Sequence, residues 1–225
     1  MITELQQAEK LALSLFDRIQ ELQIIFPLKL ESEVNEEICK LAHDEFGIQK
    51  YWHKRIVRAG INTLSPYKEN PSDIRIQHND IVFLDFGPLI EDWEADLGRT
   101  YTIGKDPEKI KLCANIEEAW KQIKVWVETK KLENGKLSCQ DLFHRCEETA
   151  QQYGYSLGGE IAGHLVGQYP HERLEAGNYG LYIHPENTLD LFSSSPNGDK
   201  RHWILELHFV HSSGEYAAFF EQLLI

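Results

Sequence analysis

Two stretches of this sequence place single carboxylate residues inside otherwise apolar strand patterns. In the stretch from 80 to 104, Asp85 lies within the run IVFLDF and Asp96 lies within the run ADLGRTYTI. Runs rich in β-branched and aromatic residues are typical of buried strands. A loop centred between Ile90 and Glu91 makes the two runs a hairpin in which Asp85 faces Asp96, and facing like charges are destabilising unless a proton or a cation lies between them. The alternative for this hairpin alone is a longer turn that leaves one aspartate in water.

The C-terminal stretch from 202 to 225 repeats this arrangement with two glutamates. Glu206 and Glu221 are single acids inside apolar runs, and a turn at Ser213 and Gly214 places them directly opposite each other. Side chains alternate between the faces of a strand, so Glu206 points away from its apolar neighbours. Unpaired buried charges are unfavourable by several kcal/mol each. The two hairpins together therefore predict that four acids converge on a cation site.

Histidines that can complete such a site occur in the glycine-punctuated segment GGEIAGHLVGQYPHERLE. His164, flanked by Gly163 and Gly167, is the better candidate ligand, whereas a structural role and a site role are evenly balanced for His171. The isolated His53 is interpreted as structural or exposed and receives no role. Oxygen ligands with a few imidazoles suit Mn, Zn, Fe(II) or Co, and the sequence offers no thiolates at a usable spacing.

In this order, the residues resemble the pita-bread metallopeptidase family, which includes methionine aminopeptidase, aminopeptidase P, prolidase and creatinase. The matching motifs are LDFG at Asp85, ADLGRT at Asp96, GHLVG at His164, PHE at His171, ILEL at Glu206 and FFEQ at Glu221. Weaker similarity covers most of the remaining chain. The resemblance implies an α+β pita-bread fold, with a mixed, mainly antiparallel sheet, helices on one side and two pseudo-symmetric halves.

The resemblance also implies a dinuclear centre that holds two divalent ions, with Mn, Zn, Co and Fe as candidates. Asp85 chelates one ion, and His164 and Glu206 bind the other. Asp96 and Glu221 bridge the two ions. A hydroxide between the ions then attacks the carbonyl of the substrate.

Three residues are expected to assist this attack. Glu206 is the candidate to relay the proton of the attacking water, and the family implies that His171 stabilises the tetrahedral intermediate. Aminopeptidase P and methionine aminopeptidase carry a substrate-contacting histidine eighteen residues before the first aspartate, where this chain has Tyr67. A neutral phenol donates a hydrogen bond but is a poor proton acceptor at pH 7, so Tyr67 is predicted to act as a donor only.

The predicted function is that of a dinuclear metal-dependent hydrolase, an aminopeptidase or an X-Pro peptidase or dipeptidase. Two alternatives stay open: a non-peptidase C–N hydrolase of creatinase type, and a catalytically silent binding protein on the same fold. A serine hydrolase is disfavoured, although Ser156 lies in a GxSxG match. The match follows a helix pattern and precedes a Gly-Gly pair, which reverses the strand-to-helix turn of a nucleophile elbow.

The order of helical and strand patterns occurs twice along the chain. We therefore expect one catalytic domain over 1–225 whose halves, about 1–105 and 106–225, are related by structural duplication. The predicted helices cover residues 3–23, 32–46, 107–130 and 138–154. The start signals of the last three are Ser32, Asp106 with Pro107, and Ser138 with Asp141. Residues 51–60 are predicted to form a strand and residues 61–79 a loop.

Composition and charge narrow the possible partners. The net charge of −13 argues against a nucleic-acid partner, because such proteins carry basic patches. The sequence has neither an export signal nor a long apolar run, so no membrane association is expected. The four cysteines lack CxxC spacing and are expected to be reduced thiols in a cytoplasmic protein. A small peptide or small-molecule substrate is expected, and a homodimer is expected by analogy alone.

Overall fold

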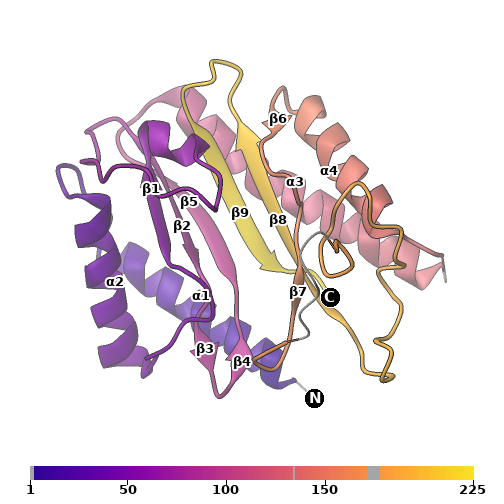
Figure 1. Cartoon of the computed structure of the whole chain (residues 1–225). Coiled ribbons are helices and arrows are strands. Elements are labelled where there is room, and N and C mark those ends of the chain that lie inside the picture. The colour runs from indigo at the N-terminus through magenta and orange to yellow at the C-terminus, as the bar shows by residue number, and fades with distance from the viewer. Residues whose placement is uncertain (1–2, 134, 172–177) are drawn as a thin grey trace.

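The computed structural model describes residues 3–133, 135–171 and 178–225. In this part of the chain, helices cover one face of a seven-stranded sheet with the order β1-β2-β5-β9-β8-β6, in which β7 also pairs with β8 (Figure 1). The helices are α1 (Glu4–Glu21), α2 (Glu31–Phe46), α3 (Pro107–Leu132) and α4 (Cys139–Gln152). The sheet strands are β1 (Ile56–Ala59), β2 (Ile81–Phe86), β5 (Leu97–Thr102), β6 (Ser156–Leu157), β7 (Leu165–Val166), β8 (His202–Val210) and β9 (Ala217–Leu223). All of these pairings are antiparallel, as the sequence predicts for most of the sheet.

Helices α3 and α4 begin at their predicted start signals. The Asp106 carboxylate accepts hydrogen bonds from the backbone N–H groups of Glu108 and Lys109 at 2.9 and 3.3 Å, and Pro107 is the first helical residue. At α4, Ser138 and Asp141 form the expected capping box. Local side-chain chemistry is therefore sufficient to fix both boundaries.

The predicted start signal of α2, Ser32, is wrong. The helix begins at Glu31, and the Glu33 carboxylate accepts a hydrogen bond from the backbone N–H of Leu30 at 2.7 Å. The Ser32 hydroxyl instead donates to Asp73 at 2.6 Å. A residue distant in sequence binds the hydroxyl, and Glu33 takes over part of the capping.

Strand β1 occupies only the second part of the predicted strand 51–60. Its partner β2 ends at Phe86, and the next residues, Gly87 and Pro88, leave the ladder. Pairing resumes only at one isolated bridge, Tyr51 with Pro88, whose register differs by two residues from that of Ile56 with Asp85, so the residues between Tyr51 and Ile56 leave the strand. Trp52 still donates its backbone N–H to Gly87 at 3.0 Å, so the irregular segment before β1 stays beside the end of β2. The chain after β1 forms the 3₁₀ helix η1 (Gly60–Leu64), which includes the first residues of the predicted loop 61–79.

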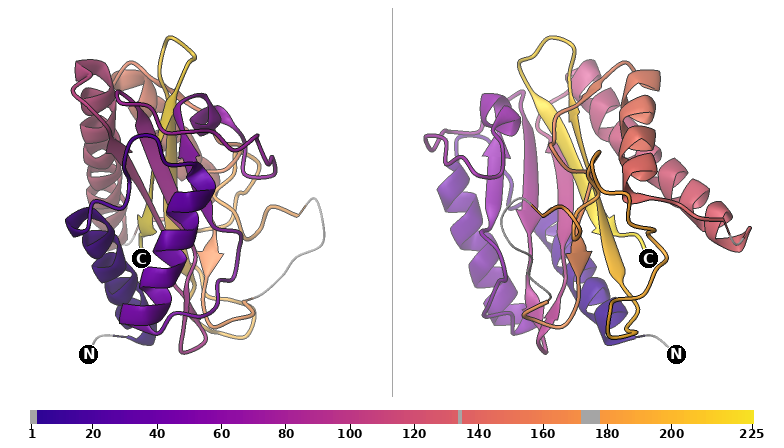
Figure 2. Two further views of the ribbon diagram at one scale, coloured as in Figure 1. Left: turned by 90° about the vertical axis from the view of Figure 1, so that its left-hand side faces the viewer. Right: turned by 45° about the vertical axis from the view of Figure 1, so that its right-hand side comes forward.

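The two faces of the sheet differ in composition. On one face, Leu84 and Phe86 of β2 pack against the buried side chains of α1 and α2. On the same face, Leu205 and Leu207 of β8 pack against α3 and α4. The strand alternation turns the acids to the opposite face, and the left view of Figure 2 shows α1 and α3 on one side of the sheet.

The two halves of the chain meet where β5 lies beside β9. The ladder there consists of one residue pair, Gly98 with Glu221. Side chains extend the contact: the Arg99 guanidinium donates to the Glu221 carbonyl at 2.8 Å, and the Thr100 hydroxyl both donates to and accepts from the backbone of Phe219 at 2.7 Å. The sheet is thus continuous from one half to the other.

The structure also bears on two further expectations, which concern membrane-spanning helices and the state of the cysteines. Among the helices of the described residues, none has the length and apolar character that a bilayer span requires. The four cysteines are free thiols, and Cys139 and Cys146 are buried.

Candidate metal centre

A single row of residues crosses the sheet on the face opposite the four α-helices. This face is called the helix-free face below. Asp85 pairs with Gly98, Gly98 pairs with Glu221, and Glu221 pairs with Glu206. The predicted register of the C-terminal hairpin, with Glu206 opposite Glu221, is confirmed. Three acids from both halves of the chain therefore lie along one line of the sheet.

The predicted register of the first hairpin is wrong by two residues. Asp85 faces Gly98, and Asp96 lies just before the first residue of β5. The turn is centred on Glu91 and Asp92, which both have positive φ, at 50° and 65°. A turn of this kind favours Asn-Gly or Asp-Gly, so Glu-Asp gives little sequence signal. The short ribbon of β3 (Leu89–Ile90) and β4 (Trp93–Glu94) continues from this turn.

Gly98 makes the close approach of the acids possible. A Cβ atom at this position would lie 2.4 Å from Phe219 Cε1 and 2.8 Å from Glu221 Cβ. Contacts below 3.0 Å force neighbouring atoms to move. The absence of a side chain in the middle of the row thus lets β9 lie directly against β5, with Glu221 near Asp85 and Asp96.

Two histidines contact different oxygens of the Asp96 carboxylate. His164 Nε2 lies 3.3 Å from Asp96 Oδ2 and 3.4 Å from Glu221 Oε1. His53 Nε2 lies 3.1 Å from Asp96 Oδ1 and 3.6 Å from Asp85 Oδ1. In each of the two groups, His53 with Asp85 and Asp96, and His164 with Asp96 and Glu221, the ligand atoms lie within 4.8 Å of one another.

The buried carboxyl groups resist simultaneous ionisation. Burial, partly offset by His53, raises the pKa of Asp85 to about 7. Burial and the neighbouring Asp96 charge raise the pKa of Glu221 to about 8, and burial with the facing Glu221 holds the pKa of Glu206 well above its ordinary value. Glu221 Oε2 is also buried without a hydrogen-bond partner. Such a group of acids is compatible with full ionisation only when cations lie among them.

Asp96 differs from the other acids because it contacts both imidazoles. Burial opposes its ionisation, but His53 and His164 together lower the pKa of Asp96 to about 2. The reciprocal effect raises the pKa of His53 to about 10 and that of His164 well above its ordinary value, in both cases against the opposing effect of burial. Asp96 is the charged centre of the cluster.

His171 lies next to this cluster rather than inside it. Its Nδ1 is 2.6 Å from Glu94 Oε2, and the same carboxylate oxygen accepts a hydrogen bond from the backbone N–H of Gly167 at 3.0 Å. The Trp52 ring has edge contacts with His53, His164 and His171, at centroid distances of 4.5, 5.4 and 5.6 Å. Glu94 and Trp52 thus fix the position of the His171 ring at the border of the site.

Tyr67 lies at the outer edge of the same site. Its ring is 6.2 Å from that of His53, and the residue is 49% exposed. Its hydroxyl accepts a long hydrogen bond from the backbone N–H of Lys54, at 3.4 Å. The predicted site residues therefore come together, with Tyr67 at the solvent side.

The sequence interpretation missed two residues of this site. His53 belongs to an irregular segment before β1, so no strand periodicity indicates its direction. Glu94, which is 1% exposed, had a weak signal: it lies two residues before Asp96, the spacing that puts two side chains of an extended chain on one face. Ser156 lies in β6, the element that follows α4, so it does not stand at the strand-to-helix turn that a nucleophile elbow requires.

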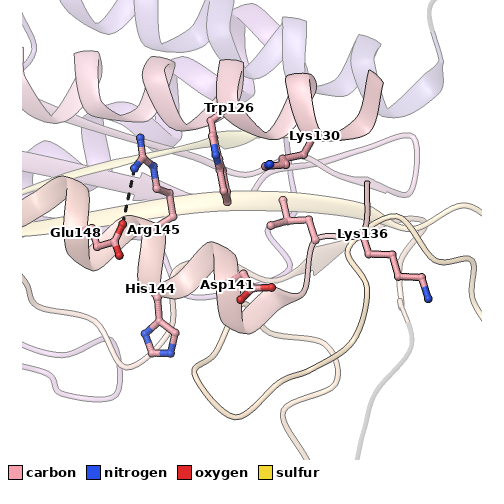
Figure 3. Close-up of a pocket in the computed structure, with 8 residues that line it drawn as sticks. Trp126, Lys130, Lys136, Asp141, His144, Arg145 and Glu148 are labelled. Carbon is pink, nitrogen blue, oxygen red and sulfur yellow. Dashed lines mark ion pairs between the residues drawn. The ribbon is translucent and has the colours of Figure 1, made fainter. Parts of the chain in front are cut away.

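A separate pocket of about 350 Å³ lies in the helix layer. Its lining comes from α3, α4 and the chain between them, and includes Trp126, Lys136 and Arg145 (Figure 3). Arg145 pairs with Glu148 at 3.7 Å at one end of this pocket. Because these helices cover the opposite face of the sheet, the pocket is not part of the carboxylate site.

The family model for metallopeptidase family M24 matches residues 3–200. This span includes His164 and both aspartates of the site and ends before Glu206 and Glu221. The participation of the two glutamates therefore rests on the strand geometry described above. Methionine aminopeptidase of Clostridium acetobutylicum is 32% identical over 115 residues, which are 49% of this chain and 42% of that protein.

Solved structures of three proteins share the fold. Prolidase from Thermococcus sibiricus superposes with a TM-score of 0.71 at 22% identity, over 96% of this chain and 53% of the other. X-Pro aminopeptidase from Thermotoga maritima gives 0.72 at 21% identity, over 96% and 55%. Methionine aminopeptidase from Rickettsia prowazekii gives 0.68 at 15% identity, over 98% and 90%. The chain spans about half the length of the Clostridium, Thermococcus and Thermotoga proteins.

These likenesses establish the pita-bread fold that the sequence resemblance predicts. The family model adds the relationship in sequence over most of the chain. The chain belongs to metallopeptidase family M24.

Proposed function

We propose that this chain is a metal-dependent hydrolase that removes residues from the N-terminus of peptides or cleaves X-Pro bonds. One observation carries the proposal: acids from both halves of the chain form one row on the helix-free face, and His164 contacts both Asp96 and, within this row, Glu221. Glu221 has a buried oxygen without a partner in this row, which a cation would satisfy. The names of the similar proteins, methionine aminopeptidase and X-Pro aminopeptidase, support the substrate class.

The residues proposed to hold two divalent ions are Asp85, Asp96, His164, Glu206 and Glu221. Four ionised carboxylates carry a charge equal and opposite to that of two divalent ions, which supports this number. Bound divalent ions supply Lewis-acid polarisation of a carbonyl and lower the pKa of a water molecule. Oxygen donors with imidazole fit Mn, Zn, Co or Fe(II). We propose that the bound metal is one of these four, with Mn among the candidates.

The remaining chemistry is assigned to side chains of this chain. Glu206, whose pKa burial raises, is proposed to take the proton of the attacking water and deliver it to the leaving amine. His171, whose Nδ1 donates to the Glu94 carboxylate, is proposed to contact the tetrahedral intermediate through Nε2, which donates a hydrogen bond when the ring carries both protons. Tyr67, exposed at the border of the site, is proposed to donate its phenolic hydrogen to the substrate.

Elemental analysis together with peptide assays tests the proposal. The purified chain, loaded with Mn, Co or Zn, is expected to hold about two ions and to cleave N-terminal methionine peptides or X-Pro dipeptides. Chelator is expected to abolish the cleavage, and re-addition of metal to restore it. Bound metal without cleavage of any peptide would instead favour the creatinase-type hydrolase or the silent binding protein. A chain that binds no metal would contradict the proposal.

Three accompanying proposals concern organisation and location. Residues 1–225 are proposed to form one catalytic domain with halves at about 1–105 and 106–225, which the continuous sheet supports. A cytoplasmic location is proposed from the four free cysteines. A homodimer is proposed by analogy, and size-exclusion chromatography with light scattering tests it.

A further inference from the structure

The two imidazoles of the site are arranged alike. His53 Nε2 faces one oxygen of the Asp96 carboxylate at 3.1 Å, and His164 Nε2 faces the other oxygen at 3.3 Å. Each ring also approaches a second acid, Asp85 for His53 and Glu221 for His164. Each imidazole thus contacts the shared Asp96 and one further acid.

The second nitrogen of each ring has the same kind of partner. His53 Nδ1 lies 2.7 Å from the carbonyl oxygen of Lys54, and His164 Nδ1 lies 3.0 Å from that of Leu165. A carbonyl only accepts, so Nδ1 carries the hydrogen in both rings. In the neutral ring Nε2 then presents its lone pair, and a carbonyl partner for the other nitrogen is the usual arrangement around metal-binding histidines.

The surroundings hold the His53 ring in this orientation. The side chain is 9% exposed, and the Trp52 ring contacts it edge-on. Gly87 provides the space, because a Cβ atom there would lie 2.1 Å from His53 Cδ2 and 2.2 Å from Nε2. The ring is therefore confined with Nε2 directed at Asp85 and Asp96.

We propose that His53 Nε2 is a ligand of the cation held by Asp85 and Asp96, so that each of the two cations has one imidazole. This inference rests on the proposed function, since it presumes that the site holds metal. Nitrogen donors favour Zn, Co and Fe(II) relative to Mn. The cation on the Asp85 side is accordingly expected to be Zn, Co or Fe(II) rather than Mn, with mixed nitrogen and oxygen ligands.

X-ray absorption at the zinc edge of the zinc-loaded chain tests the inference directly. About one imidazole per zinc is expected, because His53 binds one of the two ions and His164 binds the other. About half an imidazole per zinc, in a chain that binds two ions and cleaves peptides, would overturn the inference and leave the proposed function intact. A wild-type chain that binds no zinc would overturn both.

Substitution of the histidine gives an independent test. His53→Gln is expected to weaken binding of one of two cobalt ions by about tenfold or more, and to change the visible spectrum of the cobalt protein. His208→Gln is the matched control, because His208 is another imidazole on the helix-free face whose Nε2 binds a backbone carbonyl, that of Thr63 at 2.8 Å. Circular dichroism checks that both variants are folded. Unchanged cobalt affinity and spectrum in folded His53→Gln would contradict the role, and the wild-type absorption measurement decides the matter if the variant does not fold.

Discussion

The two flanks of the carboxylate site are built differently. On the C-terminal flank, Glu206 and Glu221 face each other in the middle of a regular hairpin whose pairing runs from Ile204 to Val210. On the N-terminal flank, Asp85 faces a glycine, and Asp96 lies outside the strand. The imidazole of this flank, on His53, comes from an irregular segment. Regular pairing positions one flank, and turns and local contacts position the other.

This difference shows which errors of register a site tolerates. The predicted register of the first hairpin was displaced by two residues, and Asp85 and Asp96 nevertheless share a face. Because side chains alternate with a period of two, an even displacement keeps each side chain on its face, whereas a displacement of one residue would have moved Asp96 to the helix side. The sequence therefore predicts which acids share a face of the sheet more readily than it predicts the distances between them.

Removal of the charge at Asp96 should have the largest effect, because both imidazoles contact this carboxylate. In Asp96→Asn we expect both flanks to lose metal and kcat/KM to fall about 10³-fold or more, which corresponds to about 4 kcal/mol. Elemental analysis and peptide assays measure these losses. Asp92→Asn, in the exposed turn nearby, is the control and should match the wild type. Full metal content in Asp96→Asn would show that the flanks bind metal independently.

Glu206→Gln tests the C-terminal flank alone. Loss of the proton relay is expected to lower kcat by about 10²- to 10⁴-fold, while the ion of the N-terminal flank remains bound. Steady-state kinetics and metal analysis on the same preparation separate the two effects. Glu215→Gln, at the exposed turn between β8 and β9, serves as control. A kcat within twofold of the wild type would rule out the relay.

Glu94→Gln tests the support of His171, which belongs to neither hairpin ladder. The substitution replaces a charged acceptor 2.6 Å from Nδ1 with a neutral amide, and a displaced ring is expected to lower kcat by up to about 100-fold. Metal content should stay at the wild-type value, unlike in Asp96→Asn. Glu91→Gln, in the neighbouring exposed turn, controls for loss of a charge. Loss of metal without a separate effect on turnover would assign Glu94 to the metal centre instead.

The smallest expected effect is the pH dependence of the stability of the metal-free protein. In the folded chain the pKa of Asp85 is about 7 and that of Glu221 is about 8, above the unfolded values of 3.8 and 4.5. The folded state then holds more protons, so the free energy of unfolding falls as pH rises from about 4 to about 8. His53 acts in the same direction, since the stability it contributes below pH 6.5 is lost as pH rises through 10. The lowered pKa of Asp96 changes the free energy of unfolding in the opposite direction, but only below about pH 3.8, the pKa of this group in the unfolded chain.

Thermal unfolding of the chelated protein measures this dependence. Between pH 5 and pH 8 we expect the melting temperature to fall by about 5–10 °C. Comparison of Asp85→Asn with Glu221→Gln shows which flank is responsible, because each variant should flatten its own part of the curve. A melting temperature that rises over this range would contradict the argument.

Much of the architecture was predictable because its signals are local. The capping residues at Asp106 and Ser138 fixed two helix starts, and the Ser213-Gly214 turn fixed the register of Glu206 against Glu221. The start of α2 was not predictable in this way, since Ser32 binds Asp73, a partner far along the chain. The turn at Glu91 and Asp92 gave no distinctive signal either.

The sequence by itself determined which acids share one face of the sheet, because strand alternation depends only on the order of residues. It also carried the motifs of the family. Only the tertiary structure decided that Gly98 lies between Asp85 and Glu221, and that His53 approaches Asp96. The Gly98 contacts join strands from the two halves of the chain, which are far apart in sequence. His53 belongs to irregular backbone, whose direction follows from packing against Trp52 and Gly87 and has no period that a sequence could reveal.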